Sequence, residues 1–123
     1  MLKPVWIEVP VKDINRAAKF YQSVFQLEAG EVANDGVRET ITLVNTSEGG
    51  APGISLNKTA NFEPSDKGMF LYLDVGDDML NALTRVTAAG GTVVTPKTSM
   101  GAAGSYAAVK DTEGNLFGLY CYP

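Results

Sequence analysis

The 123 residues of the chain, 45% of them hydrophobic, are enough for one compact soluble domain. The formal net charge is −4, from 10 Lys and Arg against 14 Asp and Glu, so no basic surface is expected for nucleic acid or an anionic membrane. No apolar run approaches the roughly 20 residues of a membrane span. No basic segment followed by an apolar stretch marks a signal peptide, so a cytoplasmic protein is expected. The single cysteine, Cys121, cannot form an internal disulfide.

The chain starts with a predicted strand that leads into an amphipathic helix. Side chains alternate along residues 5–9 (VWIEV), so the three aliphatic residues share one face while Trp6 and Glu8 share the other. Asp13 is placed to cap the following helix. The apolar residues of that helix recur at helical spacing, at Ile14, Ala17, Ala18, Tyr21, Val24 and Phe25. Because this face covers the aliphatic side of the strand, function is to be sought on the side of Trp6 and Glu8.

Three further strands are predicted in the first half. Residues 27–32 and 38–44 form a hairpin around residues 34–36 (Asn-Asp-Gly), which tolerate the positive φ that a tight turn needs. Residues 45–53 are a loop, and residues 54–57 are a short strand with Ser55 on one face. The polar stretch 58–68 contains Pro64 and is the predicted boundary between the halves 1–60 and 61–123.

The second half repeats the order of the first. Residues 69–75 predict a strand with Phe70, Tyr72 and Asp74 on one face. Asp77 and Asp78 open a helix that runs to residue 89, and its predicted buried side consists of Leu80, Leu83, Val86 and Thr87. Strands follow at residues 92–95, 105–110 and 116–122, with a flexible loop at 98–104 and a tight turn at 111–115.

Both halves therefore read strand, helix, strand, strand, strand. A unit of this length is too long for most solenoid repeats, so a duplicated module is the simpler interpretation. The sequence predicts an α+β fold of two βαβββ modules in one compact domain. Their strands are expected to form a curved eight-stranded mixed sheet, a half-barrel with the helices on its outer face and a cleft on the other.

The predicted open face carries most of the candidate functional side chains. Trp6, Phe70, Tyr72 and Tyr120 share it with Gly118, which removes a side chain where large ones converge. These aromatic residues have two interpretations. They line a pocket that stacks flat ligands, or they pack between the two sheets or at a dimer contact.

Glu8, on the same face, also has two interpretations. It is either a ligand-binding carboxylate or general base, or a structural acid paired with Arg38, because a mid-strand carboxylate needs some partner.

The segments VPVKDINRAAKFYQSVFQLE, FLYLDVGDDMLNALTRVTAAGG and DTEGNLFGLY resemble the vicinal-oxygen-chelate superfamily. This superfamily includes glyoxalase I, extradiol dioxygenases, and fosfomycin- and bleomycin-resistance proteins. The resemblance extends over residues 5–122 and implies the paired βαβββ fold, often as a homodimer. Catalytic members hold a divalent ion with His, Glu or Gln at four positions, which correspond here to Glu8, Ser55, Phe70 and Gly118.

Of these four positions, only Glu8 carries a plausible metal ligand, and the sequence contains no histidine. A shift of register could add Glu39 or Asp74, but the site would still have only two or three oxygen ligands. We therefore expect no metal and no other cofactor. The prediction is a protein similar to bleomycin-resistance proteins that binds a small organic molecule, such as an aromatic one, in the cleft between the modules. The predicted ligand-binding residues are Trp6, Glu8, Ser55, Phe70, Tyr72, Gly118 and Tyr120.

Two alternatives stay open at this point, as does the question of whether the protein is an enzyme. One is a lyase, isomerase or dioxygenase of the same superfamily, with Glu8 supporting a metal or acting alone as a base. The other is a dimeric interaction module whose cleft is filled and inert. A homodimer is expected in each case, because two half-open sheets leave edges to cover.

Overall fold

The computed structural model describes residues 1–28, 30–46 and 50–123, and in this part of the chain eight strands form two four-stranded sheets. The first sheet has the order β1-β4-β3-β2 and the second has the order β5-β8-β7-β6. The first sheet consists of β1 (Trp6–Pro10), β2 (Ala33–Asn34), β3 (Arg38–Val44) and β4 (Gly53–Thr59). The second consists of β5 (Tyr72–Asp74), β6 (Thr92–Ser99), β7 (Ser105–Lys110) and β8 (Leu116–Cys121). The helices are α1 (Ile14–Phe25), α2 (Met79–Ala88) and the short 3-10 helix η1 (Gly101–Ala103).

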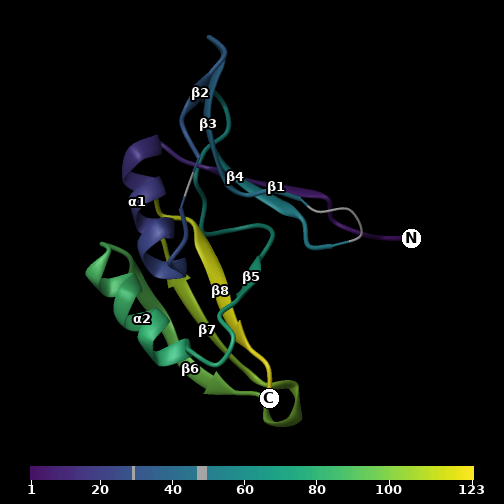
Figure 1. The fold of residues 1–123 in the computed structure, drawn as a ribbon. Helices are drawn as coiled ribbons and strands as arrows, with labels where there is room; N and C mark the ends of the chain where they lie inside the picture. The colour runs from purple at the N-terminus through teal and green to yellow at the C-terminus, as the bar shows by residue number, and fades with distance from the viewer. Residues whose placement is uncertain (29, 47–49) are drawn as a thin grey trace.

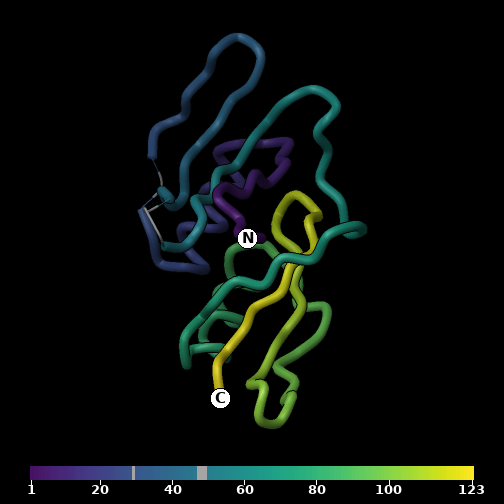
Figure 2. The backbone as a smooth tube through the Cα atoms, turned by 90° about the vertical axis from the view of Figure 1, so that its right-hand side faces the viewer, coloured from purple at the N-terminus to yellow at the C-terminus, as the bar shows by residue number. Residues whose placement is uncertain are grey.

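The two modules have the same topology. β1 pairs with β4 and β5 pairs with β8 in parallel, and the other pairs are antiparallel. The α+β class and the duplicated βαβββ order are therefore confirmed, with the eight strands divided between two sheets. In Figure 1 the helices α1 and α2 lie side by side, to the left of β7 and β8. Figure 2 shows the first module above the second, with the helices behind. None of the helices described is long and apolar enough to cross a membrane.

The α1 helix forms as the sequence predicts. Asp13 is the N-cap, and its Oδ1 accepts a hydrogen bond from the backbone N–H of Arg16 at 3.0 Å. Gln26 ends the helix in the left-handed conformation at φ 52°. The predicted apolar face packs inward, and Phe20, 1% exposed, joins it because a 3.6-residue period places it beside that face. The core contains Ile14, Ala17, Ala18, Phe20, Tyr21 and Val24 from this helix.

The α2 helix differs from the prediction in the face it buries. Its buried residues are Met79, Ala82 and Val86, whereas Leu80 is 66% exposed and Thr87 is exposed. The prediction was wrong for Leu80 because Met79 starts the apolar stripe one residue earlier, at the spacing i, i+3 and i+7. Asp78 is the N-cap residue, but its carboxylate bonds to side chains, to Arg85 at 3.2 Å and to Asn81 at 2.7 Å.

Several strand boundaries also differ from the prediction. The described residues of 27–32 form no strand, and residue 29 lies outside the described residues. Leu27 instead donates its N–H to Gln22 at the end of α1, at 3.2 Å, and packs against the core. The strand predicted at 69–75 is only Tyr72–Asp74, and β6 continues through Pro96 to Ser99. The turn at residues 34–36 is confirmed, since Asn34 Oδ1 accepts from the N–H of Gly36 at 2.9 Å.

The turn at residues 111–115 joins the second module to the first. The Glu113 carboxylate accepts the backbone N–H groups of Lys12 at 2.9 Å and Asp13 at 2.8 Å, and it also bonds to Arg16 Nε at 2.8 Å. Asn115 donates from Nδ2 to the carbonyl oxygen of Pro10 at 2.8 Å. These bonds hold the end of β1 and the start of α1 against the second module.

Candidate functional site

The uncovered face of the first sheet holds three of the predicted residues. Trp6 donates from Nε1 to Ser55 Oγ at 3.1 Å, and Glu8 lies opposite Ser55 in the β1–β4 register. A Cβ atom at Gly53 would overlap the Trp6 ring, so this glycine lets the indole lie close against β4. Trp6 is fixed in this position yet 41% exposed, and it therefore presents aromatic surface to solvent.

Glu8 is paired with Arg38, as the structural interpretation of this carboxylate requires. Arg38 Nη1 lies 3.5 Å from Glu8 Oε1, and Arg38 Nε lies 3.5 Å from Asp35 Oδ2. The Glu8 and Arg38 side chains are 39% and 48% exposed. Such an open pair contributes little to stability, typically below about 1 kcal/mol. Both groups can therefore turn toward a ligand at little cost.

A second cluster lies on the other sheet. The ring centroids of Phe70 and Tyr72 are 4.9 Å apart, and both rings lie against Gly118, where a Cβ atom would overlap them. Tyr72 is also the neighbour of Gly118 in the β5–β8 register. Phe70 is 42% and Tyr72 is 51% exposed. These rings therefore form a surface on β5 and β8 and leave the core to other residues.

Tyr120 is held at the end of β8. Its ring packs edge-on against Tyr122 with centroids 4.9 Å apart, and its hydroxyl bonds to the carbonyl oxygen of Ala103 in η1. The hydroxyl is thus engaged by the protein itself.

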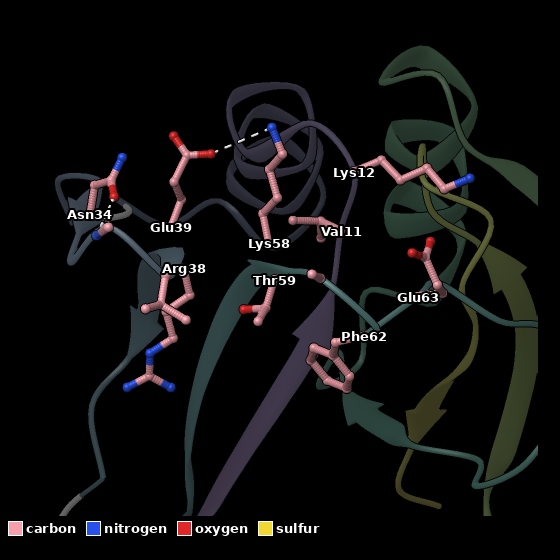
Figure 3. Close-up of a pocket in the computed structure, with 12 residues that line it drawn as sticks. Val11, Lys12, Asn34, Arg38, Glu39, Lys58, Thr59, Phe62 and Glu63 are labelled. Atoms are coloured by element: carbon pink, nitrogen blue, oxygen red, sulfur yellow. Dashed lines mark hydrogen bonds and ion pairs between the residues drawn. The ribbon is translucent and has the colours of Figure 1, made fainter.

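The structure also contains a groove that the sequence analysis did not find. This rim groove, of about 700 Å³, lies at the start of β3 and the end of β4, beside the β1–α1 turn (Figure 3). It is lined by Val11, Lys12, Asn34, Gly36, Val37, Arg38, Glu39, Lys58, Thr59, Ala60, Phe62 and Glu63, none of them a predicted ligand-binding residue. Its lining comes from three separate segments of the chain. The periodicity within one segment cannot predict which other segments it will contact.

Comparisons with known proteins identify the family. A family model for the Glyoxalase/Bleomycin resistance protein/Dioxygenase superfamily matches residues 3–119. The chain belongs to this superfamily. No curated protein gives a significant match.

Solved structures of the superfamily share the fold. A glyoxylase/bleomycin resistance protein/dioxygenase domain from Frankia sp. EAN1pec is 17% identical over 100% of this chain and 94% of its own, with a TM-score of 0.77. A family enzyme from Burkholderia phytofirmans PsJN is 20% identical over 99% and 100% of the two chains, with a TM-score of 0.74. Glyoxalase I from Zea mays is 18% identical over 96% of this chain but only 44% of its own, with a TM-score of 0.74. These likenesses establish the fold.

The superfamily implies a divalent metal at four positions, and the side chains found there do not fit one. The structure brings the positions together in pairs, with Glu8 beside Ser55 and Phe70 against Gly118. The Glu8 carboxylate faces Arg38, and the Ser55 hydroxyl accepts a bond from the indole of Trp6. Phe70 and Gly118 offer no donor atom. Catalytic divalent ions need several imidazole, thiolate or carboxylate ligands, which this set lacks.

The two acids that a shift of register could add do not complete the site. Glu39 lies on the face of the sheet opposite to that of Glu8. There it is the neighbour of Lys58, and the two side chains pair at 3.5 Å. Asp74 accepts the backbone N–H of Gly76 at 2.7 Å and caps that turn. Within residues 1–28, 30–46 and 50–123, no three His, Cys, Asp or Glu side chains gather closely enough to hold a metal ion.

Proposed function

We propose that the protein binds a small organic molecule on the uncovered faces of β1, β4, β5 and β8 and that it does so without a metal ion. The observation that carries this proposal is the exposure of three aromatic side chains there, Trp6 at 41%, Phe70 at 42% and Tyr72 at 51%. Burying apolar surface is favourable by about 25 cal/mol per Å², so a flat ligand that covers these rings is stabilised.

Polar groups beside the rings give such a ligand a direction. Ser55 holds the Trp6 indole at a fixed angle, and the exposed Glu8–Arg38 pair supplies one acceptor and one donor of opposite charge. Gly118 keeps the space under Phe70 and Tyr72 free of a side chain. Apolar walls with a few polar groups are typical of small-molecule sites. Membership of a superfamily that includes bleomycin-resistance proteins supports a binding role.

Fluorescence of Trp6, the only tryptophan in the chain, provides the test. We expect saturable quenching by members of a panel of flat aromatic molecules in protein that has been treated with a chelator. Phe70→Ala removes one stacking ring, so the affinity should fall roughly tenfold. Leu80→Ala is the matched control, because Leu80 is 66% exposed on α2, away from these faces, and its loss should leave the affinity unchanged.

Two results would contradict the proposal. Stoichiometric zinc, nickel, iron or manganese in protein purified without a chelator would favour the metal-dependent lyase, isomerase or dioxygenase. No response to a broad panel, together with a Glu8→Ala variant at least as stable as the wild type, would favour an inert interaction module.

A further inference from the structure

The uncovered faces of the two modules repeat one arrangement of side chains. β1 corresponds to β5 and β4 to β8, because the two sheets have the same strand order (Figure 1). The parallel register of the first module begins with Trp6 opposite Gly53, and that of the second begins with Tyr72 opposite Gly118. The fold therefore places an aromatic residue opposite a glycine at the same position of each module.

In each pair the glycine lets the ring lie against the neighbouring strand. A Cβ atom at Gly53 would overlap the Trp6 ring, and one at Gly118 would overlap the Tyr72 ring. Trp6 is nevertheless 41% exposed and Tyr72 is 51% exposed. Each ring thus contacts the neighbouring strand and still presents aromatic surface to a ligand.

A carboxylate follows each ring at the same spacing. Glu8 comes two residues after Trp6, and Asp74 comes two residues after Tyr72, so strand alternation puts each acid on the same face as its ring. Both acids are exposed. Two residues of a strand span roughly 6.6 Å, so one small molecule can contact the ring and the acid of the same module.

Each module also has one negative charge on this face that its own cations do not balance. In the first module, Arg38 lies 3.5 Å from both Glu8 and Asp35, so one guanidinium group is shared by two carboxylates. In the second module, Asp74 accepts the N–H of Gly76 at 2.7 Å, and it forms no ion pair with the residues that the structure describes. A ligand that carries a positive charge complements both faces.

We propose that the aromatic faces contain two equivalent subsites, one in each module, and that each binds an aromatic ring bearing an ammonium group. The ring stacks on Trp6 or Tyr72, and the ammonium group lies at Glu8 or Asp74. This inference rests on the proposed function, because it divides the proposed site between the modules. A ligand that reaches both modules occupies both subsites together, whereas a single-ring ligand binds to each one separately.

The two subsites should differ in affinity. Phe70, two residues before Tyr72, also lies against Gly118 and adds a second ring to the subsite of the second module. The corresponding residue of the first module, two before Trp6, is Pro4. A single-ring ligand should therefore fill the second subsite first.

Titration with phenethylamine, a single ring with an aminoethyl chain, tests the proposal. Calorimetry should give two molecules per chain, and NMR of the ¹⁵N-labelled protein should show saturable shifts at the amides of Gly53 and Gly118. Trp6→Leu should weaken binding at Gly53 about two- to tenfold and leave Gly118 unchanged, and Tyr72→Leu should do the reverse. Phe62→Leu, at a half-buried ring outside both subsites, is the matched control and should bind as the wild type does.

The role of the ammonium group has its own test. Glu8→Gln should weaken binding at Gly53, and Asp74→Asn should weaken binding at Gly118, each about two- to fivefold, the size of one exposed charge pair. Added salt should weaken binding at both glycines by screening. The neutral analogue 2-phenylethanol should bind more weakly than phenethylamine, and equal affinities would show that the acids do not select a cation.

The remaining outcomes separate this inference from the proposed function. One molecule of phenethylamine per chain, or loss of both sets of shifts in Trp6→Leu, would overturn the two subsites and leave a single site on the aromatic faces. Quenching of Trp6 by flat aromatic molecules, with no shift at either glycine from phenethylamine, would likewise refute only the subsites. Failure of every probe to bind would refute both proposals, and spectra of the variants would confirm that each is folded.

Discussion

At the scale of single residues, Asp111 is a buried acid of the second module whose carboxylate accepts four hydrogen bonds. It is 5% exposed, and its Oδ2 accepts the hydroxyl of Tyr21 at 2.6 Å and Asn115 Nδ2 at 3.0 Å. Its Oδ1 accepts the backbone N–H groups of Glu113 at 2.8 Å and Asn115 at 3.0 Å. Burial and the Asp111 charge hold the pKa of Tyr21 well above 10.0, so the tyrosine stays a donor. The buried carboxylate is thereby fully satisfied, as buried charge requires.

Tyr21→Phe should therefore destabilise the protein without changing its core packing. It leaves the Asp111 carboxylate one donor short, and we expect the free energy of unfolding to fall by about 1.5 to 3 kcal/mol, the range for a hydrogen bond to a charged group. Urea denaturation measures the difference. Tyr122→Phe, at a residue 68% exposed, is the matched control and should leave stability unchanged. Equal midpoints for wild type and Tyr21→Phe would show that water replaces the hydroxyl.

At the scale of elements, the turn at residues 111–115 acts as a cap for a helix of the other module. The first N–H groups of a helix have no acceptor within the helix. Just before α1, the N–H groups of Lys12 and Asp13 donate to the Glu113 carboxylate. Enclosure alone would raise the pKa of Glu113, but the bonds from Arg16, Asp13, Thr112 and Lys12 outweigh it and lower that pKa from 4.5 to about 2. The ionised carboxylate is therefore a link between the modules.

This lowered pKa predicts a pH dependence. The native pKa lies below the unfolded one, so the stabilisation is complete above pH 4.5 and is lost as the pH falls towards 2. Glu113→Gln should cost about 1 to 2 kcal/mol at pH 7, since Arg16 is 51% exposed and solvent weakens its charge. The variant should also lose less stability between pH 5 and 2, about the range of the two pKa values. Thermal unfolding over this pH range measures the difference, with Glu31→Gln as the control at an exposed acid. Parallel curves of stability against pH for the wild type and Glu113→Gln would contradict this role of Glu113.

Local signals predicted the elements whose residues interact with near neighbours. Asp13 and the apolar stripe that follows it predicted α1, and residues 34–36 predicted the hairpin turn. The strand β7 has the predicted bounds. Residues 27–32 read as a strand by composition, yet Leu27 is drawn into the end of α1. The cap from Glu113 could not be foreseen, because it joins residues 100 positions apart.

Strand alternation likewise placed part of the candidate site. It put Trp6 with Glu8 on the uncovered face, and the register brought Ser55 beside them. It also put Tyr72 on the same face as Gly118, and the register makes the two direct neighbours. The rim groove was not predicted, because its walls come from three segments that meet only in the folded chain.

At the scale of the whole molecule, the two sheets leave four edges, at β1, β2, β5 and β6. Large apolar side chains stand beside two of them, with Val5 at 63% exposure before β1 and Met69 at 100% exposure before β5. Unpaired strand edges and exposed apolar side chains are both surfaces that association covers. We propose that the protein is a homodimer whose contact includes these residues.

Sedimentation velocity should give twice the chain mass of 13.1 kDa at micromolar concentration. The double variant Val5→Lys/Met69→Lys adds like charges and removes apolar surface at the contact. Its dimer dissociation constant should therefore rise about tenfold, equivalent to about 1.4 kcal/mol. Leu80→Lys, on the exposed side of α2, should dimerise as the wild type does. A monomer at every concentration would refute the dimer. A dimer that the double variant leaves intact would show that Val5 and Met69 lie outside the contact.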